Sequence, residues 1–136
     1  MCIFCQIIKK EISSRKIWED KQTLVILDTA QDMNYHLLVL PKKHIANIME
    51  CNDETLSHLT KVIRSLAQTF LNQGFAGINL LNANGKTAGQ SVEHLHFHLL
   101  LRQANDGINA WPKLPGSTIS LDETYANLKI NDRDVR

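Results

Sequence analysis

Apolar and polar residues alternate along this chain with two different periods, one typical of a helix and one typical of strands. Between residues 53 and 72 the apolar side chains recur every three or four positions, at Leu56, Leu59, Ile63, Leu66 and Phe70. This spacing forms one apolar stripe and predicts a long amphipathic helix over Asp53–Asn72. Asn52 or Asp53 can cap the start of the helix, and Gly74 follows its end.

Five shorter apolar segments are bounded by turn residues and predict β-strands. These segments are Lys16–Asp20, Leu24–Asp28, His36–Leu40, Ala76–Ala83 and His94–Arg102. Pro41 closes the third strand, because proline has no N–H group for a ladder. Among the first three strands, and again between the last two, the links are too short for parallel crossovers. We therefore expect an antiparallel sheet.

A single long helix packed across such a sheet gives an α+β domain. Two short helices are expected near the ends of the chain, at Cys5–Lys10 and Leu121–Ile130. With 136 residues the chain has the length of one ordinary domain.

Positive and negative side chains nearly cancel, giving a formal net charge of +1. This balance offers neither a basic surface for nucleic acid nor a polybasic patch for a membrane, so we expect neither partner. Apolar runs such as Leu24–Leu27 are too short to span a bilayer, and residues 1–5 lack the features of a signal peptide. Three cysteines, an odd number, fit a reducing compartment. We therefore expect a cytoplasmic protein.

Three histidines alternate with apolar residues in the segment His94-Leu95-His96-Phe97-His98. On a strand the three imidazoles share one face. A strand that is merely polar on one side would more naturally carry Thr, Ser or Lys. Neighbouring histidines lie about 6.5 Å apart and the outer two about 13 Å apart, so all three do not easily converge on one ion. The pattern favours a reacting centre at His96, with subsidiary roles at His94 and His98.

The tripeptide Gly89-Gln90-Ser91 lies just before the histidines. Glycine lets a backbone approach a ligand closely, and Gln90 and Ser91 supply neutral donors for phosphate oxygens. By itself the tripeptide also fits a plain turn. Its place next to three histidines favours a phosphate site.

The segment His94–Leu100 resembles the signature of the histidine triad family. Other segments that resemble this family are Cys2–Ile8 with Glu11-Ile12, Leu38–Ile45, Asn82, Gly89–Val92 and Trp111-Pro112. The last of these is similar to the tail of the nucleotide-binding phosphoramidase branch. We therefore expect a single histidine triad domain over residues 1–136, with its core at 2–112 and a C-terminal extension at 113–136.

The resemblance implies a five-stranded antiparallel sheet that a homodimer extends to ten strands. It also implies hydrolysis or transfer at the α-phosphate of a nucleotide, through a nucleotidyl-histidine intermediate. The expected substrate partner is a purine nucleotide. By position, His96 is the nucleophile, and His98 and Ser91 contact the phosphate. The residues implied to bind or place the substrate are Asp28, Ile26, Thr29, Asn82, Gly89 and Gln90, with His36 behind the triad.

The leaving group of the reaction indicates which class of nucleotide is the substrate. An amine is protonated more readily than a phosphate is expelled, so we expect nucleoside phosphoramidates. No carboxylate cluster for Mg²⁺ is evident in the sequence, so we expect no metal in the chemistry. Hydrolysis of dinucleoside polyphosphates is the alternative within the same chemistry. Alternatives of other classes are a nucleotide-binding regulatory protein with incidental catalysis, and a metalloprotein that uses the triad itself as ligands.

The spacing Cys2-x-x-Cys5 is that of half a zinc site, and two free thiols also fit it. His44 and His94 could complete a tetrahedron, and many bacterial members of the histidine triad family have such a Cys-Cys-His-His site. A closed site with four protein ligands is structural, because it leaves no position for water. We expect a structural Zn²⁺ at this site.

The chain departs from the family pattern at three places. Asp32-Met33-Asn34-Tyr35 replaces a Pro-containing stretch, Glu93 stands where the phosphoramidase branch usually has an aromatic residue, and the tail continues beyond Pro112. The changed stretch Asp32–Tyr35 affects the shape of one side of the nucleotide pocket. The longer tail affects what the C-terminal extension contributes to that pocket.

Overall fold

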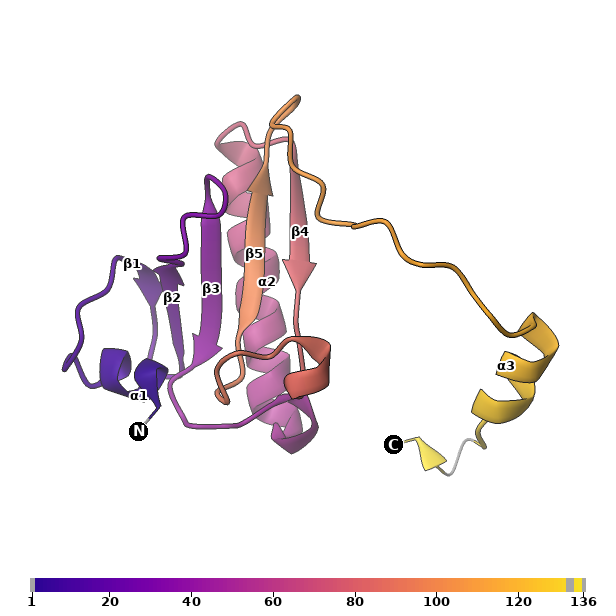
Figure 1. Cartoon of the computed structure of the whole chain (residues 1–136). Coiled ribbons are helices and arrows are strands. Elements are labelled where there is room, and N and C mark those ends of the chain that lie inside the picture. The colour runs from indigo at the N-terminus through magenta and orange to yellow at the C-terminus, as the bar shows by residue number, and fades with distance from the viewer. Residues whose placement is uncertain (1, 132–133, 136) are drawn as a thin grey trace.

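The computed structural model describes residues 2–131 and 134–135 of the chain. Five strands form one antiparallel sheet in the order β1-β2-β3-β5-β4 (Figure 1). The strands are β1 (Lys16–Glu19), β2 (Thr23–Leu27), β3 (His36–Pro41), β4 (Gly77–Leu81) and β5 (Phe97–Arg102). The helices are α1 (Ile3–Ile8), α2 (Asp53–Asn72) and α3 (Leu121–Leu128), with short 3-10 turns η1 (Ile48–Glu50) and η2 (Lys86–Ala88). The predicted α+β class is confirmed.

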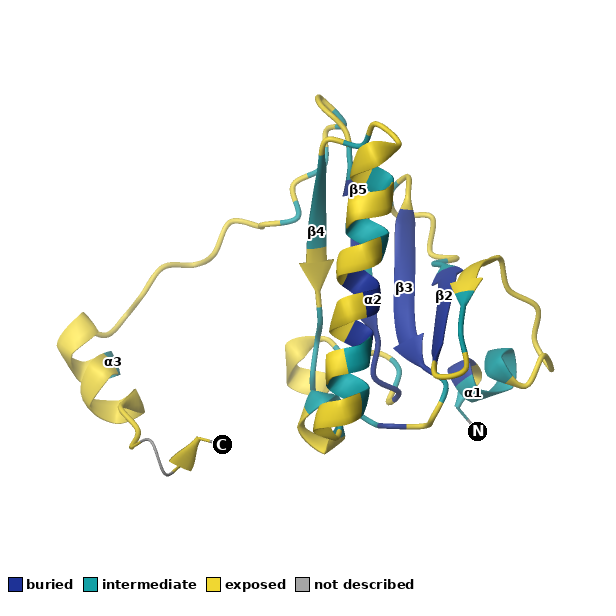
Figure 2. Cartoon of the chain, turned by 180° about the vertical axis from the view of Figure 1, so that it is seen from behind, coloured by how far each residue is buried: buried dark blue, intermediate teal, exposed yellow. Residues whose placement is uncertain are grey.

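Helix α2 lies across one face of the sheet (Figure 2). Its predicted bounds are confirmed, and the Asn52 side chain caps it by accepting the Thr55 N–H at 2.8 Å. Leu59 and Ile63 are buried between the helix and the sheet. The strand residues in the same cluster are Val25, Leu37, Val39, Phe97, Leu99 and Leu101.

The opposite face of the sheet is covered by α1 over β2 and β3. Phe4 of α1 packs there in a second cluster, together with Leu24, Ile26, Leu38 and Leu40. Successive strand residues point to opposite faces. Because His98 stands opposite Leu38 in the β3–β5 register, His36 and His98 point to the α1 face. The fold thus separates an apolar α2 face from an α1 face that carries histidines.

Several predicted boundaries shift. Helix α1 begins two residues earlier than expected, because the Cys2 side chain caps it by accepting the Cys5 N–H. Strand β4 is shorter at both ends than Ala76–Ala83, and α3 ends at Leu128. Pro41 is the last residue of β3, where it stands opposite Thr23.

Strand β5 begins at Phe97, so the prediction of a strand over His94–Arg102 was too long. The Leu95 N–H donates to the Ile45 carbonyl at 2.6 Å, and the His96 carbonyl accepts from the Asn82 side chain at 2.9 Å. The backbones of Leu95 and His96 therefore bond to loops rather than to neighbouring strands. The alternation of side chains still continues, since Leu95 joins the α2 cluster while the His96 ring contacts Phe4.

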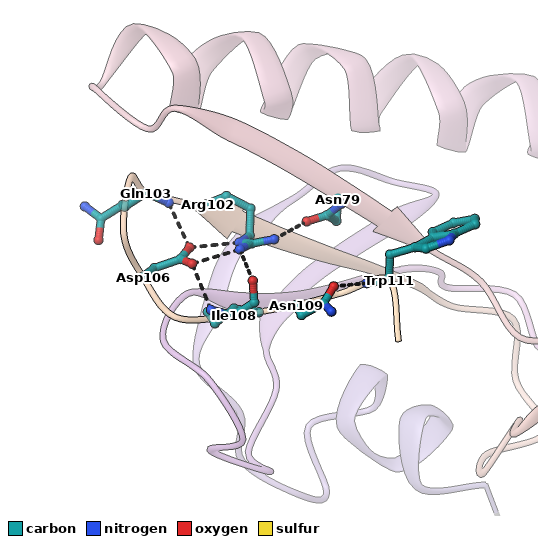
Figure 3. Close-up of polar contacts among 7 residues, drawn as sticks. All are labelled: Asn79, Arg102, Gln103, Asp106, Ile108, Asn109 and Trp111. Atoms are coloured by element: carbon teal, nitrogen blue, oxygen red, sulfur yellow. Dashed lines mark hydrogen bonds and ion pairs between the residues drawn. The ribbon is translucent and has the colours of Figure 1, made fainter. Parts of the chain in front are cut away.

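The turn after β5 is closed by an Arg102–Asp106 ion pair (Figure 3). The Nε and Nη2 atoms of Arg102 each donate to the carboxylate at 2.8 Å, and Nη1 donates to Asn79 on β4 at 2.8 Å. The same carboxylate accepts the backbone N–H groups of Gln103 and Ile108 at 3.0 Å. This cluster fixes the point at which the C-terminal segment leaves the sheet.

The C-terminal segment ends in α3, which stands apart from the sheet (Figure 1). Ser120 caps this helix by accepting the Glu123 N–H at 3.1 Å. Its apolar side chains Leu121, Tyr125 and Leu128 are exposed. Among the described residues, no helix combines the length and apolarity that crossing a membrane requires.

Candidate functional site

A row of aromatic rings lies on the α1 face of the sheet. The ring centroids of His36 and His98 are 5.0 Å apart, and those of His98 and His96 are also 5.0 Å apart. Phe4 packs edge to face against both His96 and His94, at centroid distances of 5.1 and 5.8 Å. The fold therefore brings the three triad histidines and His36 together, with Phe4 as their apolar support.

The protonation of the His96 ring is fixed by the backbone. Its Nδ1 atom lies 2.7 Å from the His94 carbonyl oxygen, which can only accept, so Nδ1 carries the proton. A neutral imidazole then has a free lone pair on Nε2. Thr23 Oγ1 is the one fully buried side-chain N or O atom of the described residues without a partner. The His96 ring is buried. Within the described part of the chain, its Nε2 atom has no hydrogen-bond partner and yet is not among the fully buried unpartnered atoms, so solvent reaches it.

His98 is joined to His36, which in turn is joined to an acidic residue. His98 Nδ1 lies 2.8 Å from His36 Nε2, and His36 Nδ1 lies 2.9 Å from the Asp32 carboxylate. Burial lowers the pKa of His98, and the neighbouring His96 and His36 lower it further. The imidazole of His98 is therefore mostly neutral at pH 7 and can exchange a proton with a bound group.

His94 takes part in a separate cluster with Cys2, Cys5 and His44. The His94 Nε2 atom donates to the Pro41 carbonyl at 2.7 Å, which leaves Nδ1 as the free acceptor. This Nδ1 lies 3.5 Å from Cys2 Sγ and 3.6 Å from Cys5 Sγ, and His44 Nδ1 lies 3.3 Å from Cys5 Sγ. Desolvation lowers the pKa of His94, so its ring is neutral, as a metal ligand must be.

These four donor atoms fit a tetrahedral metal centre. With Zn–S and Zn–N bonds of the usual length, a tetrahedron places sulfur and nitrogen about 3.5 Å apart. The observed separations of 3.3 to 3.6 Å agree with that value. All four ligand atoms lie within 4.8 Å of one another, so the predicted ligand set is brought together.

Asn82 and Gln90 are hydrogen-bonded to the backbone around the triad. Asn82 donates to the His96 carbonyl, while Gln90 donates to the carbonyls of Ala46 and Val92 at 2.7 and 3.0 Å. Gln90 also accepts the Gly85 N–H at 2.9 Å. These amides brace the loop before the triad. Gly89 adopts a left-handed conformation with φ of 93° at the end of η2, which suits glycine.

The remaining predicted site residues lie around two surface hollows. Asp28 and Thr29 line a hollow of about 550 Å³ together with His36, whereas Ile26 does not line it and is buried in the Phe4 cluster. One Asp28 oxygen accepts the Ala30 N–H at 2.8 Å, and the other lies 3.5 Å from His36 Nε2. Ser91 is exposed at a second hollow, of about 570 Å³, beside Gln90.

Comparison with known proteins places this arrangement in a family. The model of the HIT domain matches residues 9–105, which is more than half of the chain. The chain belongs to the HIT domain family. The resemblance to histidine triad proteins is thereby confirmed, and the His94–His98 segment lies within the matched range.

Individual HIT relatives match most of the chain. An uncharacterized HIT-like protein of Methanocaldococcus jannaschii is 40% identical over 107 residues, covering 79% of this chain and 83% of that protein. The adenosine 5′-monophosphoramidase of Saccharomyces cerevisiae is 39% identical over 113 residues, covering 82% and 70%. The crystal structure of a histidine triad nucleotide-binding protein from Candida albicans is 32% identical, with a TM-score of 0.78 and coverage of 93% and 92%.

Sequence reasoning missed two residues of this HIT site. Phe4 was an apolar position of a short helix, and nothing in its spacing indicated contact with His96. Asp32 lies four residues before His36 in an irregular segment, so no periodicity marked it. Outside the site, His58 of α2 is half-buried and bonds Asp20 at 2.6 Å.

Proposed function

We propose that this HIT protein hydrolyses nucleoside phosphoramidates at the α-phosphate. The observation that carries the proposal is the hydrogen bond from His96 Nδ1 to the His94 carbonyl, 2.7 Å long. It leaves the His96 Nε2 lone pair available as a nucleophile beside a second imidazole. The name of the yeast relative, an adenosine 5′-monophosphoramidase, supports the same substrate class.

The reaction divides into two displacements at phosphorus. His96 Nε2 attacks the α-phosphorus, the P–N bond to the amine breaks, and the amine leaves with a proton from the protonated form of His98. Water then attacks the nucleotidyl-histidine and gives a proton to His98, which releases the nucleoside monophosphate and regenerates neutral His96 and protonated His98. A covalent intermediate replaces one difficult displacement by two easier ones.

The phosphate oxygens need fixed donors where charge develops. We assign direct contact to His98 and Ser91, with the backbone at Gly89 close to the ligand. Asn82 and Gln90 place these donors indirectly, since their amides bond the His96 carbonyl and the loop backbone. Each of these residues therefore acts on the geometry at phosphorus.

The nucleoside lies, in this proposal, along the hollow at the end of β2. Asp28 accepts the ribose hydroxyl groups, Thr29 lines the rim, and Ile26 supports the pocket from the buried side. His36 stands behind the triad and holds His98. The expected ligand is a purine nucleotide.

A structural Zn²⁺ held by Cys2, Cys5, His44 and His94 is part of the proposal. The sulfur–nitrogen separations and the neutral His94 ring support it. With four protein ligands the ion stabilises the contact between α1 and the triad segment, and the chemistry at phosphorus uses none of its bonds.

The assembly and location are also proposed. Strand β4 is an edge strand of the sheet, which supports a homodimer with a ten-strand sheet. The three cysteines, all of which lie in the described residues, form no disulfide, which supports a cytoplasmic location.

The test is turnover of adenosine 5′-phosphoramidate, followed by ³¹P NMR, in the wild type and in His96→Asn. The wild type should release AMP and ammonia, and the variant should bind AMP with nearly unchanged affinity but not turn over. Diadenosine polyphosphates and adenylyl sulfate serve as competing substrates. A higher kcat/KM for a diadenosine polyphosphate would make dinucleoside polyphosphates, and not phosphoramidates, the substrate class. Turnover by His96→Asn would refute the mechanism.

A further inference from the structure

Asp32 lies at the end of a hydrogen-bonded chain that reaches the triad. Its Oδ1 atom is 2.9 Å from His36 Nδ1, and His36 Nε2 is 2.8 Å from His98 Nδ1. The His36 ring is buried, whereas the Asp32 side chain is 60% exposed. A surface carboxylate is thus linked through one buried imidazole to the last histidine of the triad.

The loop that carries Asp32 has a constrained backbone. Gln31 and Tyr35 adopt left-handed conformations, with φ of 54° and 61°, which non-glycine residues seldom do. The Tyr35 carbonyl accepts the Leu101 N–H at 3.1 Å, and its ring packs on Phe75 with centroids 4.9 Å apart. Such conformations persist where surrounding contacts over-determine them. The contacts of Tyr35 therefore fix the end of the loop that adjoins His36.

The Asp32 carboxylate sets the donor and acceptor roles in these two hydrogen bonds. Its bond to His36 lowers the pKa of Asp32, so the group is ionised at neutral pH and can only accept. His36 must then carry a proton on Nδ1. In a neutral His36 the Nε2 atom is an acceptor, so His98 donates from its own Nδ1. His98 Nε2 remains as the nitrogen that can face a substrate.

We propose that Asp32 is a positioning residue that acts through His36 to hold His98 as its Nδ1–H tautomer and to stabilise its protonated form. This inference rests on the proposed function, in which His98 Nε2–H gives its proton to the leaving amine as the P–N bond breaks. His98 then becomes neutral, and its Nδ1–H bond to His36 is unchanged. Nε2 is reprotonated by the water that attacks the nucleotidyl-histidine, which closes the cycle.

The charges around His98 determine the expected pH effect. Asp32 and Asp28 face the His36–His98 pair as anions, and His96 faces it as a further imidazole. An anion favours the imidazolium form, so removal of Asp32 lowers the pKa of His98. Activity that requires protonated His98 is then lost at a lower pH, and the alkaline limb of the kcat profile moves to lower pH.

Two measurements on Asp32→Ala, Asp32→Glu and the wild type test this role. ¹⁵N NMR of the imidazole nitrogens, without substrate, reports which nitrogen of neutral His98 carries the proton. The kcat profile with adenosine 5′-phosphoramidate reports its ionisation. Asp32→Ala should lose the Nδ1–H preference and show kcat about tenfold lower on the alkaline limb, the factor that one pKa unit gives. KM should change less than kcat, and Asp32→Glu should restore both properties.

Asp20→Asn is the matched control, because Asp20 bonds His58 in a carboxylate–imidazole pair that is separate from the Asp32–His36–His98 hydrogen bonds. It should leave the His98 tautomer and the pH profile unchanged. The proposal is overturned if Asp32→Ala retains both properties or if Asp32→Glu fails to restore them. If the wild type does not turn over the phosphoramidate, the proposed function fails, while the tautomer measurement still decides the role of Asp32.

Discussion

Asn82 donates its side-chain N–H to the backbone carbonyl oxygen of His96 at 2.9 Å. The oxygen of the same amide accepts from Asn84, whose own side chain accepts the Ile48 N–H at 2.7 Å. A line of amides thus ties the His96 backbone to the loop before α2. His96 lies outside β5. These bonds therefore hold its backbone in place, as hydrogen bonds to neighbouring strands would inside a sheet.

Replacing Asn82 by alanine should loosen His96 without removing a reacting group. We expect kcat to fall about tenfold, which corresponds to one net hydrogen bond of about 1 kcal/mol with some loss of orientation. Steady-state kinetics with adenosine 5′-phosphoramidate measure the change. Asn79→Ala is the control, since Asn79 bonds Arg102 far from the His96 backbone. An unchanged kcat in Asn82→Ala would show that the amide line has no part in orienting His96.

Phe4→Ala should destabilise the α1 face. Phe4 is 7% exposed and contacts His94 and His96. Truncating a buried phenylalanine costs about 3 to 5 kcal/mol, so urea unfolding should move to a lower midpoint. Phe4→Leu keeps most of the buried area and should lose less than half as much. Equal losses in the two variants would contradict a packing role.

Cys5→Ser should remove a metal ion and lower the melting temperature. Metal analysis of the purified wild type should find one zinc per chain, and the variant should contain far less. Cys51→Ser is the control, because Cys51 lies outside the four-residue ligand cluster. Retention of zinc in Cys5→Ser, or its loss in Cys51→Ser, would be incompatible with the proposed site.

Glu19 links stability to pH at the edge of the sheet. The bonds from Lys16 and Lys42 lower the pKa of Glu19 from 4.5 to about 2. A carboxyl group with a lowered folded-state pKa stabilises the fold above its ordinary pKa, and this contribution disappears as the pH falls toward 2. Melting temperatures between pH 6 and pH 2 should therefore decline less in Glu19→Gln than in the wild type. Parallel declines would argue against these ion pairs.

The fold could be predicted from the sequence where a single period dominates. The stripe of α2 and its cap at Asn52 gave the helix bounds, and the short links gave an antiparallel sheet. The start of β5 could not be predicted in this way. Side chains alternate from His94 onward, but the backbone partners of Leu95 and His96 come from loops distant in the sequence.

The candidate site could be predicted where residue type limits the chemistry. The alternating histidines and the Cys2-x-x-Cys5 spacing pointed to groups that the fold does bring together. The Asp32–His36 bond depends on left-handed residues in an irregular loop, and Phe4 reaches the triad through tertiary packing. Local sequence patterns predict neither of these contacts.

Trapping the covalent intermediate decides whether His96 is the nucleophile. The wild type and His96→Gly are mixed with adenosine 5′-phosphoramidate, quenched within the first turnover, and analysed by intact-mass and peptide mass spectrometry. We predict one adenylyl group on His96 in the wild type and no adenylyl group in the variant. An adenylyl group on another residue, or wild-type rates of turnover in His96→Gly, would rule out His96 as the nucleophile.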